Sequence, residues 1–166
     1  GIEEDNGLNV LDVVKHAVST VMAVLKPQDR CSLVAYSSDA RVVFPLTAMT
    51  DGNRTRAKKA LMHLQPHGST NLWGGLQQAF EVLREGTQGH MKLAHRHQAV
   101  LLLTDGKPNI IPPNGHIPTM KKYLRQYPLN CCVHTFGFGY SLDSNLLCEI
   151  AREGNGQYAF IPDAGL

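Results

Sequence analysis

One carboxylate in the sequence follows closely on a strongly apolar segment. Asp105 comes after the apolar run 99–103 and Thr104, and Gly106 follows it. A continuous apolar run is typical of a strand buried on both faces, so Asp105 is expected at the exposed carboxyl end of such a strand. Gly106 would allow a close backbone approach or a positive φ there. The Thr70 hydroxyl lies in a second loop, just before a predicted helix. A carboxylate combined with hydroxyls favours Mg²⁺ or Mn²⁺ over zinc.

These residues also have an ordinary structural explanation. The pair Asp105-Gly106 is typical of a simple turn, and Ser69 or Thr70 could serve only as the N-cap of the following helix. On the residues alone, the metal site and this structural explanation are equally supported.

The elements that must position these groups alternate along the chain. Apolar residues at helical spacing predict helices over 8–25, 51–64, 72–86, 119–127 and 144–152, and apolar runs predict strands over 31–37, 41–46, 99–103, 132–138 and 158–161. Alternating strands and helices indicate an α/β fold, a Rossmann-like, doubly wound and mostly parallel sheet with helices on both faces. The first two strands form a hairpin, and Pro45 suits an edge position, so one antiparallel edge strand is expected.

Ligands bind such sheets at the carboxyl ends of the strands. Thr70 and Asp105 are the candidate metal ligands at that rim. The other residues placed there form a candidate partner-binding rim: Ser38, Asp39, Ser69, Asn71, Trp73 and Gly106. For Trp73, a role as a binding anchor and a role in packing are about equally supported.

Length and composition limit the class of protein. The chain of 166 residues is predicted to be a single domain over 1–166, with 43% hydrophobic and 18% charged residues. A net charge of +2 gives no electrostatic footprint for nucleic acid or an anionic membrane surface, and no apolar stretch reaches the roughly 18 residues of a membrane span. Four cysteines without the spacing of a disulfide scaffold favour a reducing, cytoplasmic or otherwise intracellular location.

Five segments, taken in order, resemble a von Willebrand factor type A (VWA) domain over nearly the whole chain. They are 29–37, 68–72 (Gly-Ser-Thr-Asn-Leu), 102–106 (Leu-Leu-Thr-Asp-Gly), 134–139 and 154–158. The resemblance is strongest to an intracellular branch found in fungal, protist and plant proteins, some of which carry RING, U-box or Hint modules. It implies a metal-ion-dependent adhesion site (MIDAS) with Thr70 and Asp105 as ligands. A partner protein would complete the metal shell with an acidic residue, so the implied role is binding and not catalysis.

The sequence departs from the family at its first motif. The family's Asp-x-Ser-x-Ser loop is absent, because the positions after Asp12 that should carry hydroxyls are Val14 and His16, and Asp12 lies within the first predicted helix. We therefore expect that the first strand, which is central in this fold, is missing. Residues before Gly1 or another chain would have to donate it.

Three functions follow from this pattern. The first is a metal-dependent protein-interaction module, and the second is a metal-independent scaffold within a larger protein of the ubiquitin-ligase type. The third is a metal-dependent hydrolase, which is disfavoured because the sequence has neither a Gly-x-x-x-x-Gly-Lys phosphate loop nor a Gly-x-Ser-x-Gly elbow.

Overall fold

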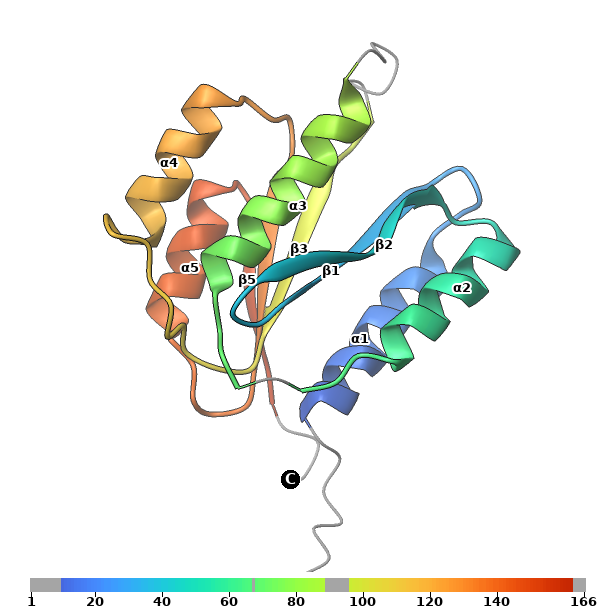
Figure 1. Cartoon of the computed structure of the whole chain (residues 1–166), viewed down its shortest axis with the longest axis horizontal. Helices are drawn as coiled ribbons and strands as arrows, with labels where there is room; N and C mark the ends of the chain where they lie inside the picture. Colours follow the sequence, from blue (N-terminus) through green and yellow to red (C-terminus); the bar gives the residue numbers. More distant parts are fainter. Residues whose placement is uncertain (1–9, 67, 89–95, 163–166) are drawn as a thin grey trace, which may run out of the picture.

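A computed structural model describes residues 10–66, 68–88 and 96–162. Helices and strands alternate through this part of the chain (Figure 1). Their order is α1 (Val10–Val24), β1 (Arg30–Tyr36), β2 (Ala40–Ala48), α2 (Asp51–Met62), α3 (Leu72–Thr87), β3 (Ala99–Thr104), α4 (His116–Gln126), β4 (Cys132–Phe138), α5 (Ser144–Glu153) and β5 (Tyr158–Ile161). The predicted α/β class is confirmed. The predicted start of the first helix, Leu8, lies outside the described residues.

The strands form two separate ladders. β1 and β2 pair antiparallel, whereas β3, β4 and β5 form a parallel sheet in the order β3-β4-β5. The antiparallel edge strand and the edge position of Pro45 agree with the sequence. Within the described residues no ladder joins β1 to β3, so the strands form two separate parts. This division agrees with the expectation that a central strand is missing, and the truncation itself stays a prediction.

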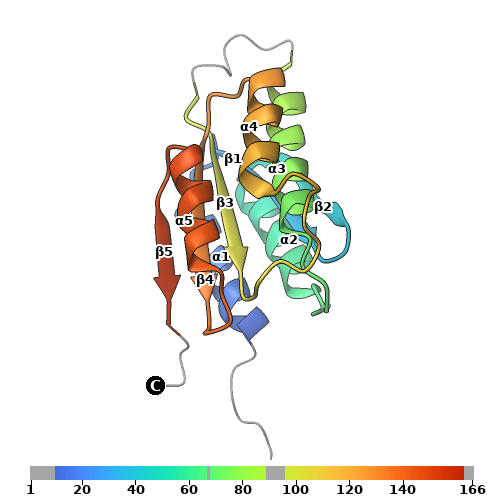
Figure 2. The same ribbon diagram turned by 90° about the vertical axis from the view of Figure 1, so that its left-hand side faces the viewer.

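Two hydrophobic clusters hold the helices against the strands. The larger joins α3, α4 and α5 to β3 and β4 and includes Phe80, Leu102, Met120 and Ile150, whereas the smaller joins α1 and α2 to β2. Figure 2 shows α5 in front of the parallel sheet and α1 behind it. Helices therefore lie on both faces, as predicted.

The burial of β3 differs from the prediction. Val100, Leu102 and Thr104 are buried, but Ala99 is exposed and the exposed fraction of Leu101 is 38%. The buried side chains face the α3–α4–α5 cluster. The alternate side chains lack comparable cover within the described residues, so the expectation of burial on both faces was wrong.

Helix α4 begins three residues earlier than predicted. Gly115, with φ of +83°, precedes His116, and Pro118 lies in the first turn. A proline costs little there, because the first N–H groups of a helix have no intrahelical partner. In the described part of the chain, no helix has the length and apolar character needed to cross a membrane.

Candidate functional site

The carboxyl ends of β1 and β3 and the loop before α3 lie at one rim, and Asn71 connects two of these segments. Its backbone N–H donates to the Ser37 carbonyl at 2.7 Å, and its side-chain Nδ2 donates to the Ser38 carbonyl at 3.0 Å. Its Oδ1 accepts from the Gly74 N–H at 2.9 Å, which caps α3. Asn71 therefore ties the end of β1 to the start of α3.

A second connection joins the Thr70 loop to the loop that follows Asp105. The Thr70 N–H donates to Asn109 Oδ1 at 2.9 Å, and the Asn109 N–H donates back to the Thr70 carbonyl at 3.2 Å. The Ile110 N–H also donates to that carbonyl, at 3.4 Å. The two candidate ligands thus lie on loops that are bonded to each other through the main chain.

Tyr36 links the end of β1 to the end of β3. Its hydroxyl donates to the Leu103 carbonyl at 3.0 Å. Burial raises the pKa of Tyr36 to about 12, and the negative charge of Asp105 adds to this effect.

The Thr70 hydroxyl and the Asp105 carboxylate have no hydrogen bond or ion pair within the described part of the chain. Thr70 is half-buried and Asp105 is exposed. Both oxygens are hard donors of the kind that Mg²⁺ and Mn²⁺ accept. Residues 10–66, 68–88 and 96–162 contain no group of three or more His, Cys, Asp or Glu side chains arranged to hold a metal. The two oxygens thus fit part of a metal shell and do not complete one.

The other residues predicted for the rim differ in their surroundings. Ser38 and Asp39 are exposed in the turn after β1, and Ser69 is half-buried. Gly106 does not use the positive φ that glycine would allow, and a Cβ there would meet nothing within 4 Å; its place in the partner-binding rim stays a prediction. The Thr104 hydroxyl closes this turn instead by donating to the Gly106 carbonyl at 3.1 Å.

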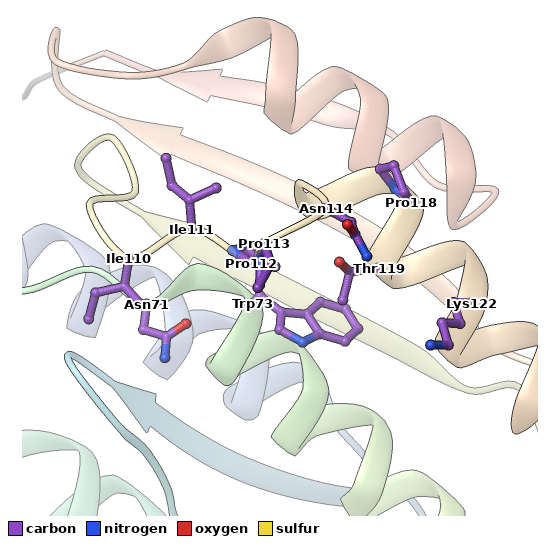
Figure 3. Close-up of a pocket in the computed structure, with 10 residues that line it drawn as sticks. All are labelled: Asn71, Trp73, Ile110, Ile111, Pro112, Pro113, Asn114, Pro118, Thr119 and Lys122. Atoms are coloured by element: carbon purple, nitrogen blue, oxygen red, sulfur yellow. The ribbon is translucent and has the colours of Figure 1, made fainter.

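Trp73 combines the two roles considered for it. Its ring packs against Phe80 and Tyr123, and it also lines a pocket of about 430 Å³ (Figure 3). The sequence analysis did not identify this pocket or its other wall, the loop with Ile110 and Ile111. Two adjacent isoleucines in a proline-rich loop were the available signal, since apolar side chains that are exposed next to each other can mark a ligand-binding groove.

Comparison with known proteins decides the family. The model of the von Willebrand factor type A domain matches residues 4–165. The chain belongs to the VWA domain family. VWA domains are commonly protein-interaction modules with a MIDAS site and are typically not enzymes.

Curated relatives of this VWA domain include bacterial and animal proteins. It is 29% identical over 153 residues to the uncharacterized protein YfbK of Escherichia coli, covering 91% of this chain and 25% of that protein. It is 27% identical over 147 residues to the inter-alpha-trypsin inhibitor heavy chain H1 of Sus scrofa, covering 86% of this chain and 16% of that protein. The chain thus spans a quarter or less of these relatives. They do not support the fungal, protist and plant branch suggested by the resemblance, which stays a prediction.

Solved structures share the fold. A von Willebrand factor type A protein from Catenulispora acidiphila has a TM-score of 0.77 at 23% identity, covering 92% of this chain and 34% of that one. Proximal thread matrix protein 1 from the mussel byssus, with a zinc-occupied MIDAS motif, has a TM-score of 0.69 at 20% identity, covering 93% of this chain and 39% of that one. At these identities the likeness concerns the fold alone.

Proposed function

We propose that this VWA domain binds another protein at the rim formed by the ends of β1 and β3 and the loop before α3. Thr70 and Asp105 would hold a Mg²⁺ or Mn²⁺ ion, and an acidic residue of the partner would provide a further oxygen. The observation that carries this proposal is the pair of hydrogen-bonded links through Asn71 and Asn109. These hydrogen bonds hold the loops in place without using the Thr70 hydroxyl or the Asp105 carboxylate. Both groups therefore stay free for a ligand.

Two protein oxygens are few for such an ion, because Mg²⁺ takes six oxygen ligands in near-octahedral geometry. We propose that an extended segment from outside the described residues pairs between β1 and β3 and provides more ligands. Support comes from the divided sheet and from the exposure of Leu101 on β3. If this strand ran parallel to β3, its carboxyl end would emerge between Ser37 and Asp105. The segment could come from the same protein or from another chain.

A metal-free scaffold is the second candidate function. It is favoured by the small number of metal donors in the described residues. In that case the rim would bind its partner through hydrogen bonds and apolar contacts alone. Binding would then be the same with and without metal, both for the unchanged protein and after replacement of the Asp105 charge.

Metal titration separates the two functions. Calorimetry on the protein in its native full length should detect binding of Mg²⁺ or Mn²⁺, with zinc as a third titrant. Asp105→Asn and Thr70→Val should remove that binding, whereas the control Glu149→Gln, an exposed acid on α5, should retain it. Equal binding by Asp105→Asn and the unchanged protein would reject the metal site. If the unchanged protein took up no metal, the scaffold function would be supported.

We further propose an intracellular, reducing location. Support comes from the cysteines Cys31, Cys131, Cys132 and Cys148, which are all free and half-buried. Burial raises the pKa of Cys31, and it raises the pKa of Cys131 to about 11 with a smaller effect of Cys132. Thiols with a raised pKa are poor nucleophiles, which fits a structural role.

A further inference from the structure

A pocket of about 430 Å³ lies beside the proposed metal rim, between the start of α3, the loop after β3 and α4. Figure 3 shows Asn71 and Ile110 at one end of the pocket, Lys122 at the other end and Trp73 between them. Ligand pockets usually have volumes of roughly 300–1,000 Å³, so the space suffices for a large side chain with part of its backbone.

The α3 side of the pocket is firmly supported. The Trp73 ring meets Tyr123 edge-on at 5.9 Å and Phe80 at 6.5 Å, and Phe80 stacks on Tyr123 at 5.5 Å. The Tyr123 hydroxyl in turn donates to the Glu81 carboxylate. An aromatic ring held in this way loses little freedom when a ligand contacts it, as is common for aromatic binding anchors.

The opposite side of the pocket is exposed and apolar, although its backbone is fixed. Ile110 and Ile111 have exposed fractions of 38% and 62%. The Asn109 and Ile110 N–H groups donate to the Thr70 carbonyl, and the Gly115 N–H donates to the Pro112 carbonyl at 2.9 Å. A ligand that covered these two adjacent aliphatic side chains would be stabilised by removing their apolar surface from water.

The polar groups that line the pocket indicate the chemistry of the ligand that would fit it. Lys122 is the one charged residue among those lining it, no acidic residue lines it, and the Lys122 ammonium has no ion pair within the described residues. The Trp73 indole N–H likewise has no hydrogen-bond partner in that part of the chain. An occupant with an apolar body and a carboxylate would match both the walls and the charge.

We propose that this pocket binds an extended peptide segment of a partner protein. A large aliphatic or aromatic side chain of the peptide lies between Trp73 and Ile111, and a neighbouring carboxylate pairs with Lys122. Asn71 lines the pocket and adjoins Thr70 in sequence, so a second acidic residue a few positions away reaches the proposed metal. That last contact rests on the proposed function, whereas the pocket itself does not.

The pocket is tested first without metal. The probe is 3-phenylpropionate, which has an aromatic ring and a carboxylate, added to the full-length protein in EDTA. The Trp73 indole N–H resonance, assigned by its loss in Trp73→Phe, reports on the pocket, because Trp73 is the one tryptophan of the 166 residues and lines the pocket. We expect this resonance to shift with saturation. Ile111→Asp and Lys122→Glu should each weaken the binding at least about tenfold, a loss of ~1.4 kcal/mol.

The matched control is Val24→Asp, which places the same charge on an aliphatic position at the end of α1 with an exposed fraction of 74%. It should bind the probe as the unchanged protein does. The proposal is overturned if the Trp73 resonance does not move at millimolar probe, or if Val24→Asp weakens binding as much as Ile111→Asp.

A peptide probe then separates the pocket from the metal. Acetyl-Asp-Gly-Gly-Phe-Glu-amide should bind more tightly with Mg²⁺ than with EDTA, and Asp105→Asn should remove that difference. If affinity is independent of metal but still depends on Ile111 and Lys122, the pocket stands and the proposed metal fails. If Ile111→Asp and Lys122→Glu leave peptide affinity unchanged, the pocket is overturned whatever the metal does.

Discussion

The Tyr36 hydroxyl donates a hydrogen bond of 3.0 Å to the main-chain carbonyl of Leu103, across the interval that separates the two ladders. It reaches the free edge of β3 from the last residue of β1. The Tyr36 side chain thus donates to a main-chain carbonyl that would accept from a neighbouring strand in a continuous sheet. The proposed strand and Tyr36 would therefore compete for this carbonyl.

Tyr36→Phe is expected to lower the free energy of unfolding by about 1 kcal/mol, the usual net value of one hydrogen bond. Denaturant unfolding followed by circular dichroism measures this change. The control is Tyr140→Phe, because Tyr140 is 72% exposed and its hydroxyl has no hydrogen-bond partner within the described residues. If the two variants were equally stable, the Tyr36–Leu103 bond would contribute nothing to stability.

Gly75→Ala should destabilise the protein, although alanine favours helices. A Cβ at Gly75 would lie 2.6 Å from the Cδ1 and Cγ atoms of the Tyr36 ring. Overpacking costs typically about 1–3 kcal/mol, more than the helix propensity gain of ~1 kcal/mol. Gly52→Ala in α2, where a Cβ meets nothing within 4 Å, should instead stabilise. Thermal melts that moved in the same direction for both variants would contradict the crowding at Tyr36.

Arg54→Ala should weaken the attachment of α1 to α2 and destabilise the protein. The Arg54 guanidinium donates to the carbonyls of Met22, Leu25 and Met49 at 3.1, 2.6 and 3.2 Å. Hydrogen bonds from a charged donor are each worth roughly 1.5–3 kcal/mol, so a loss of at least about 2 kcal/mol is expected. Lys58→Ala, on the exposed face of α2, is the control. Urea unfolding should show a clearly lower midpoint for Arg54→Ala alone.

His116 should make stability depend on pH. Burial lowers the pKa of His116, and the Asp143 charge opposes this effect in part. As the pH falls through the ordinary histidine value of about 6.5, the unfolded chain takes up a proton that the native state resists. Unfolding therefore becomes easier toward acid. His116→Gln should reduce this dependence between about pH 7 and pH 5, measured as unfolding free energy against pH. The control His97→Gln, at an exposed position, should retain the pH dependence of the unfolding free energy. Equal pH profiles for His116→Gln and the unchanged protein would argue against His116 as its source.

Local patterns in the sequence predicted most of the fold. The bounds of β4 and β5 were predicted as the structure has them, because each apolar run is short and ends at glycine or another turn residue. The hairpin of β1 and β2 followed from two apolar runs a few residues apart. The start of α4 was missed because the proline-rich loop was extended to His116, which is the first residue of the helix. The placement of Thr70 and Asp105 on neighbouring loops followed from the rule that parallel strands end at one rim.

The sequence by itself thus determined the element types, their order and the chemistry available at the carboxyl ends. Only the tertiary structure decided between which strands the sheet is divided, the hydrogen bonds of Asn71 and Asn109, and the pocket beside Trp73. The physical reason is the distance along the chain between the residues that interact. Helix and strand periodicity depends on residues a few positions apart, whereas these features join segments up to 67 residues apart, as with Tyr36 and Leu103. No spacing along the chain encodes such contacts.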